Sequence, residues 1–289
     1  MRRIILFCLL VISFGTSWKA IARQLIRDSI QIQGYMRHFS LIIPENTPKD
    51  APLVFVAHGY GNSGKTKTWM DKAADKYKFA LCVPIGLKDP GKNKHSWNVG
   101  YPSQQGWDVD DVKSMCKMAL YVQKKYHLSK VNTFFTGMSN GGEMCYLLAY
   151  SGQRVFKAFA SVSGLTMEWI YRTMDAPFPV PIFEIHGTAD HTSEWDGDLE
   201  NKGGWGAYMP TPIGIGYWVA RNKCETISQE TVASLQPESN RTIEKYRYSG
   251  GPTGCDVWLY KVVNGPHSWF DKDLDTGEEI WQFFSKYVK

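Results

Sequence analysis

Three residues that together can activate a hydroxyl group follow one another along the chain: a serine, an acid and a histidine. Ser139 stands in the run GMSNG, between an apolar stretch at residues 131–135 and a helix-compatible stretch at residues 140–150. A serine on a sharp strand-to-helix turn needs small residues two positions before and after it, because the backbone passes close to its neighbours there. Gly137 and Gly141 meet that need. The alternative is that Ser139 only caps the following helix.

The acid and the histidine each follow a strand-like stretch. Asp190 comes after the apolar residues 181–186, and His267 comes after residues 257–263. In an open α/β sheet, functional side chains gather beyond the carboxyl ends of the strands. We therefore predict Ser139 as nucleophile, His267 as general acid and base, and Asp190 as the carboxylate that orients the imidazole. Asp196 and Asp198 are rival acids, but they lie in a stretch without periodicity.

Acyl transfer also needs two N–H donors for a tetrahedral oxyanion. The N–H of Asn140, directly after the serine, is one candidate. The glycine-rich run HGYG at residues 58–61 follows another apolar stretch, and it offers the N–H of Tyr60 as the second donor. His58 and His186 are interpreted as structural histidines that brace loops.

These side chains require an alternation of strands and helices to position them. Residues 28–44 alternate polar and apolar residues around Gly34, which predicts an antiparallel pair of strands. Further strands are expected at residues 53–57, 79–84, 131–135, 157–161, 181–186, 242–249 and 257–263, and helices at residues 66–77, 108–126, 140–150, 213–223 and 274–287. The pattern predicts a mostly parallel central sheet with an antiparallel N-terminal pair and helices on both faces.

The first 22 residues have the pattern of a secretory signal peptide. They combine two arginines, an apolar run at residues 4–14 and an Ala-Ile-Ala cleavage signal. The apolar run is too short to span a bilayer of about 30 Å. We therefore expect export, with residues 23–289 forming a single domain.

Composition excludes some classes of function. Three of the 33 basic residues and none of the 28 acidic residues lie in the first 22 positions, so the rest of the chain carries a net charge of only +2. This gives no basic surface for nucleic acid. No P-loop, dinucleotide-binding or metal-binding motif occurs, so no cofactor and no metal are expected. We expect a monomer that meets an ester substrate and, after signal cleavage, no membrane.

Five cysteines remain after the signal peptide. In an oxidising compartment an odd number leaves at least one free thiol. Cys224 and Cys255 flank polar connecting segments, and we predict a disulfide between them. Cys82, Cys116 and Cys145 lie in apolar stretches and are expected to be buried.

Tryptophans on irregular segments are candidates for substrate contacts, because a flat ring stacks well on an aromatic acyl group or a sugar face. The predicted set comprises Trp97, Trp195, Trp205 and Trp269. Trp97 lies in a long loop at residues 85–106, and loops of that length are often functional. The alternative is that these rings only hold the loops in place.

Several of these motifs together resemble a known family. The runs HGYGNSG, SWNVG, DVDDV, GMSNGGEM, SVSG, HGTAD, WVARNKC and GPHSW are similar to those of secreted esterases related to polyhydroxybutyrate depolymerases and feruloyl esterases. The resemblance covers about residues 30–289. It implies an α/β-hydrolase fold, no metal, and hydrolysis of carboxylic esters, often hydroxycinnamoyl or acetyl groups on plant cell-wall polysaccharide.

By this resemblance, the catalytic roles fall on Ser139, Asp190 and His267, and the oxyanion donors on Tyr60 and Asn140. The family motifs also imply the disulfide between the two cysteines of WVARNKC and GCDV. Two departures are present. Ser96 stands where many members have a cysteine, and residues 264–266 read Asn-Gly-Pro where many members have three glycines.

The leading hypothesis is a secreted feruloyl esterase. A polyhydroxybutyrate-type polyester depolymerase or an acetylxylan esterase is the alternative among enzymes. A dipeptidase of this fold is less favoured, because no acidic pair resembles an amine clamp. Outside enzymes, the alternative is a carbohydrate-binding protein with an inert hydrolase fold.

Overall fold

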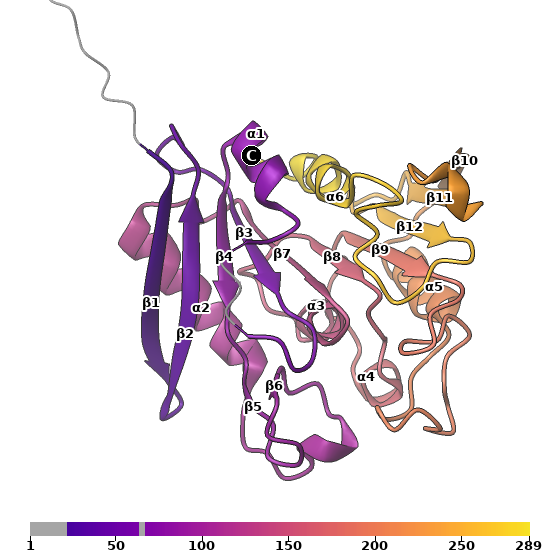
Figure 1. Cartoon of the computed structure of the whole chain (residues 1–289), viewed down its shortest axis with the longest axis horizontal. Helices are drawn as coiled ribbons and strands as arrows, with labels where there is room; N and C mark the ends of the chain where they lie inside the picture. The colour runs from indigo at the N-terminus through magenta and orange to yellow at the C-terminus, as the bar shows by residue number, and fades with distance from the viewer. Residues whose placement is uncertain (1–21, 64–66) are drawn as a thin grey trace, which may run out of the picture.

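The computed structural model describes residues 22–63 and 67–289. Among them, ten strands form one sheet in the order β1-β2-β4-β3-β7-β8-β9-β12-β11-β10, and β5 and β6 form a small separate ribbon (Figure 1). The predicted signal peptide lies outside the described residues except for residue 22.

The strands are short and mostly buried at the centre of the sheet. Their bounds are β1 Gln24–Ile32, β2 Tyr35–Ile43, β3 Leu53–Ala57, β4 Ala80–Pro84, β5 Leu87–Lys88, β6 His95–Ser96, β7 Thr133–Met138, β8 Phe159–Val162, β9 Ile182–Gly187, β10 Thr226–Ala233, β11 Thr242–Ser249 and β12 Val257–Val262.

The five central pairings, from β4 through β3, β7, β8 and β9 to β12, are parallel. The predicted antiparallel pair β1–β2 flanks them on one side and joins β4 in antiparallel register. The other side carries a second antiparallel extension, β12–β11–β10. Of this extension, β10 was missed, because its side chains are almost all exposed and show no apolar pattern.

Helices cover both faces of the sheet. They are α1 Asp71–Tyr77, α2 Asp111–Tyr126, α3 Asn140–Tyr150, α4 Glu168–Thr173, α5 Thr211–Arg221 and α6 Thr276–Ser285, with 3₁₀ turns at Pro102–Gln104 and Pro237–Ser239. In Figure 1, α1 and α6 lie on one side of the sheet, and α2, α3 and α5 lie on the other. The predicted α/β-hydrolase type of sheet, mostly parallel and covered on both faces, is confirmed.

The alternation of side chains along the strands divides the interior into two cores. Leu53 and Phe55 of β3 pack into the core beneath α2, α3 and α5, whereas Val54 and Val56 pack into the core beneath α1 and α6. Because successive residues of a strand point to opposite faces, a continuous apolar run is what a strand buried on both faces requires.

A buried ion pair joins β2 to the start of α2. Arg37 and Asp111 are each about 1% exposed, and the guanidinium donates a hydrogen bond to the carboxylate. The second oxygen of Asp111 accepts the backbone N–H of Asn98 at 2.7 Å. Asp111 therefore anchors the long loop before α2 to the body of the sheet.

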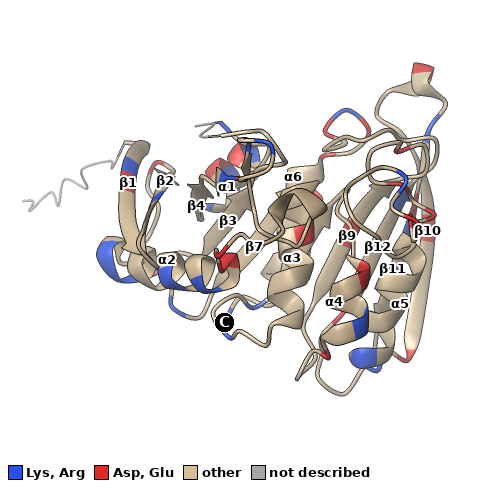
Figure 2. Cartoon of the chain, turned by 90° about the horizontal axis from the view of Figure 1, so that it is seen from below, with Lys and Arg blue, Asp and Glu red and all other residues tan. Residues whose placement is uncertain are grey.

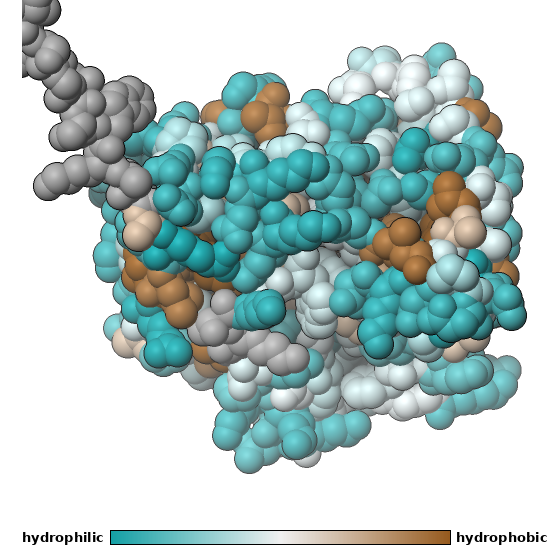
Figure 3. All heavy atoms as spheres, turned by 45° about the horizontal axis from the view of Figure 1, so that its top comes forward, coloured by the Kyte–Doolittle hydropathy of each residue, from teal (hydrophilic) through white to brown (hydrophobic). Residues whose placement is uncertain are grey.

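The surface carries no dominant charge on the face seen in Figure 2, where acidic and basic side chains are interspersed. On the face seen in Figure 3, hydrophobic residues form separate spots within a mainly hydrophilic surface. Within the described part of the chain, no helix combines the length and apolar character needed to cross a bilayer.

The predicted disulfide is absent from the structure. Both thiols are free, and each lies against a carbonyl oxygen: Cys224 Sγ is 3.7 Å from the oxygen of Cys255, and Cys255 Sγ is 3.8 Å from that of Thr253. The two residues are close, but their sulfur atoms point to backbone acceptors. Cys82 and Cys145 are buried, as expected, and Cys116 is partly buried.

Candidate active site

The turn between β7 and α3 holds Ser139 in a strained backbone conformation. Its φ is 56° and its ψ is −125°, values that non-glycine residues rarely adopt. A Cβ atom at Gly137 would lie 2.5 Å from the carbonyl oxygen of Gly141, and one at Gly141 would lie 2.4 Å from that of Ala57. Only glycine fits either position. The Ser139 side chain makes no capping hydrogen bond to α3, so the capping alternative is not observed.

Asp190 and His267 are hydrogen-bonded to each other. Asp190 Oδ2 accepts from His267 Nδ1 at 2.7 Å, and Oδ1 accepts the backbone N–H groups of Thr192 and Ser193, both at 2.8 Å. Burial raises the pKa of Asp190, but the hydrogen bond and charge of His267 outweigh it and the pKa falls below its usual value. Asp190 is thus a carboxylate at neutral pH. Because it binds Nδ1 of His267, the other ring nitrogen, Nε2, remains available for proton transfer.

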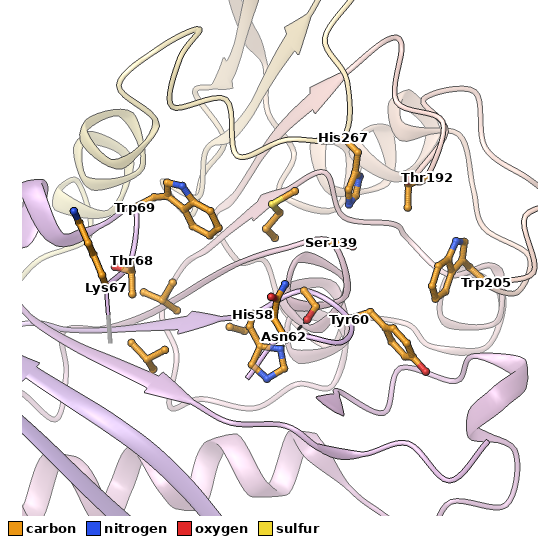
Figure 4. Close-up of a pocket in the computed structure, with 15 residues that line it drawn as sticks. His58, Tyr60, Asn62, Lys67, Thr68, Trp69, Ser139, Thr192, Trp205 and His267 are labelled. Carbon is orange, nitrogen blue, oxygen red and sulfur yellow. Dashed lines mark hydrogen bonds between the residues drawn. The ribbon is translucent and has the colours of Figure 1, made fainter. Parts of the chain in front are cut away.

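Ser139 and His267 line the same cavity of about 300 Å³. Figure 4 shows His267 and Thr192 entering from the loops on one side, and His58, Asn62 and Tyr60 lying opposite. Part of the lining is apolar and comes from strand residues. These residues are Val56, Val83 and Met138.

Two tryptophans lie on opposite sides of Ser139 in Figure 4. Trp69 precedes α1 and lies beside Thr68 and Lys67, and Trp205 lies in the irregular segment between β9 and α5. Trp205 also packs against the Tyr60 ring, with 5.3 Å between ring centroids. The cavity therefore has two aromatic walls with the serine between them.

The predicted oxyanion donors flank Ser139. A Cβ at Gly59 would lie 3.3 Å from Ser139 Cβ, so the HGYG loop passes directly beside the serine and Tyr60 follows at once. Asn140 is the first residue of α3, where backbone N–H groups have no partner within the helix and the helix dipole favours negative charge. The roles of these two N–H groups as oxyanion donors stay predictions.

His58 braces the loop that carries Tyr60. Its Nδ1 donates to the carbonyl oxygen of Gly59 at 2.8 Å, and its Nε2 accepts the backbone N–H of Gly86 at 2.9 Å. Burial is the main reason that its pKa falls to about 4, so the ring is neutral in that tautomer. The geometry agrees with a structural role for this histidine.

A buried polar network supports α3 from below. The Asn140 side chain accepts the backbone N–H of Trp97 at 2.7 Å and donates to the Trp97 carbonyl at 3.1 Å. One turn on, Glu143 accepts the hydroxyl hydrogen of Tyr101. Burial raises the pKa of Glu143 to about 7, although the hydrogen bonds from Tyr101 and Asn140 oppose that rise.

Of the four predicted aromatic contacts, Trp205 alone lines the cavity. Trp97 is fully buried, and its ring N–H donates to the carbonyl of His58 at 2.9 Å, so it supports the loop from behind. Trp195 is half-buried and packs near His186, with ring centroids 6.0 Å apart. The prediction that these two rings are pocket walls is wrong, because both are committed to packing.

The prediction that Trp269 is a wall of the cavity is also wrong. It is 2% exposed and stacks on Trp69 with ring centroids 5.0 Å apart and an interplanar angle of 16°. It therefore backs the wall that Trp69 forms. Trp69 was missed, because residues 66–77 were predicted to be one helix, whereas α1 begins at Asp71. This helix start is hard to recognise in the sequence, because Met70 at the start of α1 makes no side-chain capping hydrogen bond. Asp71 instead accepts the Thr68 N–H at 3.0 Å and holds the segment before the helix.

The described residues include no cluster of three or more His, Cys, Asp or Glu side chains arranged to hold a metal ion.

Comparisons with known proteins identify a family for the chain. Residues 31–212 match the sequence model of a family described as "Putative esterase". The chain is 24% identical over 275 residues to feruloyl esterase D of Neurospora crassa, covering 89% of this chain and 84% of that protein. It is also 24% identical over 276 residues to a bifunctional acetylxylan esterase/xylanase of Neocallimastix patriciarum, covering 91% of this chain but only 35% of that protein.

Among solved structures, an acetyl xylan esterase from Aspergillus awamori superposes with a TM-score of 0.61 at 15% identity. The match covers 91% of this chain and 99% of that one. At this identity the likeness shows the fold alone.

Proposed function

The chain belongs to this esterase family, and from that premise we propose that it hydrolyses carboxylic esters through an acyl-enzyme on Ser139. One observation carries the proposal. The hydrogen-bonded pair Asp190–His267 reaches the same cavity as a serine held on a strained turn at a helix N-terminus.

The mechanism follows from the chemistry of these groups. His267 Nε2 takes the proton of the Ser139 hydroxyl as the oxygen attacks the ester carbonyl, and Asp190 stabilises the imidazolium that forms. The N–H groups of Tyr60 and Asn140 stabilise the negative oxygen of the tetrahedral intermediate. His267 then protonates the leaving alcohol. Water attacks the acyl-enzyme with His267 again acting as base, which releases the acid and restores the serine.

The cavity favours an aromatic acyl group on a plant cell-wall polysaccharide. Its volume of about 300 Å³ exceeds what an acetyl group occupies, and the walls at Trp69 and Trp205 suit a planar ring or a sugar face. Polar side chains interrupt the apolar part of the lining, and those outside the proposed catalytic groups include Asn62, Lys67, Thr68 and Thr192. We therefore propose hydroxycinnamoyl esters as the substrate class, in line with the activity for which the Neurospora crassa relative is named.

Acetylated xylan is the second candidate substrate. The relative from Neocallimastix patriciarum and the superposed structure from Aspergillus awamori are both named as acetylxylan esterases. A polyester such as polyhydroxybutyrate is a third possibility from the sequence motifs. An acetyl group would fill only a small part of the cavity, so we expect the two substrate classes to respond differently to changes at Trp69.

A panel of esters tests the proposal. The purified protein is assayed on methyl ferulate, acetylated xylan and polyhydroxybutyrate film, with Ser139→Ala as the matched control. We expect release of ferulic acid at the highest kcat/KM, and loss of that release in the control. Turnover of none of the three esters by folded protein would contradict an esterase, and preference for acetylated xylan would reassign the substrate.

We also propose that the protein is exported as a monomer. The basic and apolar pattern of residues 1–22 supports export. Expression of the full chain with a C-terminal tag, followed by N-terminal sequencing of the external fraction, tests this. A mature N-terminus near residue 23 is expected, whereas retention of residue 1 in cell-associated protein would contradict it. Light scattering of the mature protein tests the monomer.

A further inference from the structure

Behind Asp190 lies a second pair of titratable side chains that the proposed mechanism does not use. Glu184 and His186 are both completely buried on β9, two residues apart on the same face of the strand. Glu184 Oε1 lies 2.9 Å from His186 Nδ1. Completely buried charges cost free energy unless they are paired and hydrogen-bonded. The presence of this pair in the interior therefore calls for an explanation.

Both nitrogens of the His186 ring face oxygen atoms. Nε2 lies 2.7 Å from the carbonyl oxygen of Ser193, and because a carbonyl only accepts, Nε2 must carry a hydrogen. Nδ1 faces Glu184. Burial lowers the pKa of His186, but the hydrogen bond and charge of Glu184 outweigh that effect and the net shift is upward. The two contacts together fix the orientation of the ring, with Nε2 donating to the carbonyl oxygen of Ser193.

Ser193 belongs to the turn that holds the carboxylate. Its backbone N–H donates to Asp190 Oδ1 at 2.8 Å, while its carbonyl oxygen accepts from His186. His186 Nε2 is also 3.7 Å from Asp190 Oδ2, the oxygen that holds His267. The ring therefore contacts the acid loop at two points, and neither contact reaches the cavity.

The Glu184–His186 pair also contacts α3, the helix that follows Ser139. Glu184 Oε2 accepts the hydroxyl hydrogen of Tyr146 on α3 at 2.8 Å, and Oε1 accepts the backbone N–H of Gly164 at 3.3 Å. A continuous path of contacts thus runs from α3, which begins next to Ser139, through Glu184 and His186 to the turn that carries Asp190.

We propose that His186, held by Glu184, is a positioning residue that fixes the Asp190–Ser193 turn, and with it the carboxylate that orients His267. The inference rests on the proposed function, because it assigns His186 a part in that reaction. It goes beyond the bracing role expected from the sequence, since it names the atom that His186 holds and the catalytic group that depends on it.

Two amide variants separate the two contacts of the ring. The amide nitrogen of Gln lies near the position of Nε2 and can still donate to Ser193, whereas that of Asn lies near Nδ1 and reaches only Glu184. We expect His186→Asn to lower kcat per active site by about 10- to 100-fold, because a displacement of about 1 Å at a reacting group costs about that much. His186→Gln retains most of the rate. KM changes little in either variant, since His186 does not line the cavity.

Active sites are counted by titration with a fluorophosphonate, so that loss of folded protein does not count as loss of rate.

The pH dependence of kcat/KM gives a readout that a purely structural role would not move. A displaced carboxylate interacts less well with His267, so we expect the pH profile of His186→Asn to differ from that of wild type. His38→Gln, on the exposed face of β2, is the matched control and leaves rate and profile unchanged. The other titratable groups near the pair stay in place: Glu143, Cys145, Tyr146, Asp190 and His267.

A measurement on the unmodified protein covers the case in which His186→Asn does not fold. Nitrogen-15 NMR of labelled histidines is expected to show that His186 Nε2 stays protonated from about pH 5 to 9, since its proton is committed to Ser193.

Equal kcat per titrated site and identical pH profiles in wild type, His186→Asn and His186→Gln would overturn the inference while leaving the esterase proposal intact. Loss of the Nε2 proton within that pH range would also overturn it. Wild-type protein that neither reacts with the fluorophosphonate nor hydrolyses esters would instead defeat the proposed function, and the inference with it.

Discussion

The proposed reacting groups and the walls of the cavity are built in different ways. Ser139, Asp190 and His267 follow β7, β9 and β12. These strands lie in the parallel middle of the sheet, where β9 and β12 are neighbours and only β8 separates β7 from β9. The walls at Trp69 and Trp205 come from segments outside the sheet, one before α1 and one in the irregular stretch before α5.

This difference implies that the first region carries out the reaction and the second selects the ester. Parallel strands end at the same edge of a sheet, so the order of the strands brings the three loops that carry these side chains to one edge. A loop that only has to present a ring is under no such constraint, and it can change without disturbing the reacting groups. Substitutions in the first region should therefore stop the reaction, and substitutions in the second should change which ester reacts.

The largest effect is expected from Ser139→Ala. Removal of the hydroxyl should lower turnover by about a million-fold, because no other group can form the acyl-enzyme. Its circular dichroism and melting temperature should match those of wild type, since the hydroxyl does not cap α3. Ser151→Ala, at the far end of α3, is the control and should stay fully active. Residual activity above about one hundredth of wild type would rule out Ser139 as the nucleophile.

Asp190→Asn is expected to have the next largest effect. The amide can donate to His267 Nδ1 and so favours the wrong tautomer, which should lower kcat by about 10⁴. The exposed rival Asp196 provides the control, and Asp196→Asn should leave kcat unchanged. The reverse ranking of these two variants would move the acid to the irregular segment.

Glu143→Gln probes the support beneath α3 through stability. The folded-state pKa of Glu143 is raised to about 7 from 4.5, so the folded protein binds more protons than the unfolded chain between these values. The contribution of neutral Glu143 to the free energy of unfolding is therefore complete below about pH 4.5. It falls by about 2–3 kcal/mol as the pH rises to about 7. Glu143→Gln cannot ionise, so its stability lacks this decrease.

Urea unfolding at about pH 5 and about pH 8 measures the effect. Glu143→Gln should gain stability relative to wild type between the two pH values, whereas the exposed Glu238→Gln should follow wild type. A parallel pH dependence in Glu143→Gln and wild type would show that Glu143 is already ionised at pH 5.

The cavity walls should give the smallest and most selective effects. Trp69→Ala should lower kcat/KM for methyl ferulate by about tenfold, the value of one lost aromatic contact, with little change for an acetyl ester. Trp205→Ala should act more weakly on methyl ferulate. Trp195→Ala, outside the cavity, is the control for both. Equal losses on both esters would show that Trp69 does not contact the acyl group.

The sequence was most informative where local geometry leaves few choices. The strained turn at Ser139 admits only glycine two residues before and after it, and this need is visible in the run GMSNG. The central strands are buried on both faces, so their apolar runs were easily recognised, and the positions of Asp190 and His267 followed from them.

The cavity walls could not be predicted in the same way. Trp97 and Trp269 carry the same residue type as Trp205 and also lie on irregular segments, but their rings are turned into the protein. Which side of a loop faces the cavity depends on tertiary packing, which sequence periodicity does not record. The strand β10 was missed for a related reason, because an exposed edge strand has no apolar face to reveal it.

The most direct test of the central claim is reaction of the folded wild-type protein with a fluorophosphonate, followed by mass spectrometry of its peptides. The account predicts one label per chain, on Ser139, with much slower labelling in Asp190→Asn and none in Ser139→Ala. Folded protein that takes up no label, or takes it up on another serine, would contradict the assignment and would favour a carbohydrate-binding protein with an inert site.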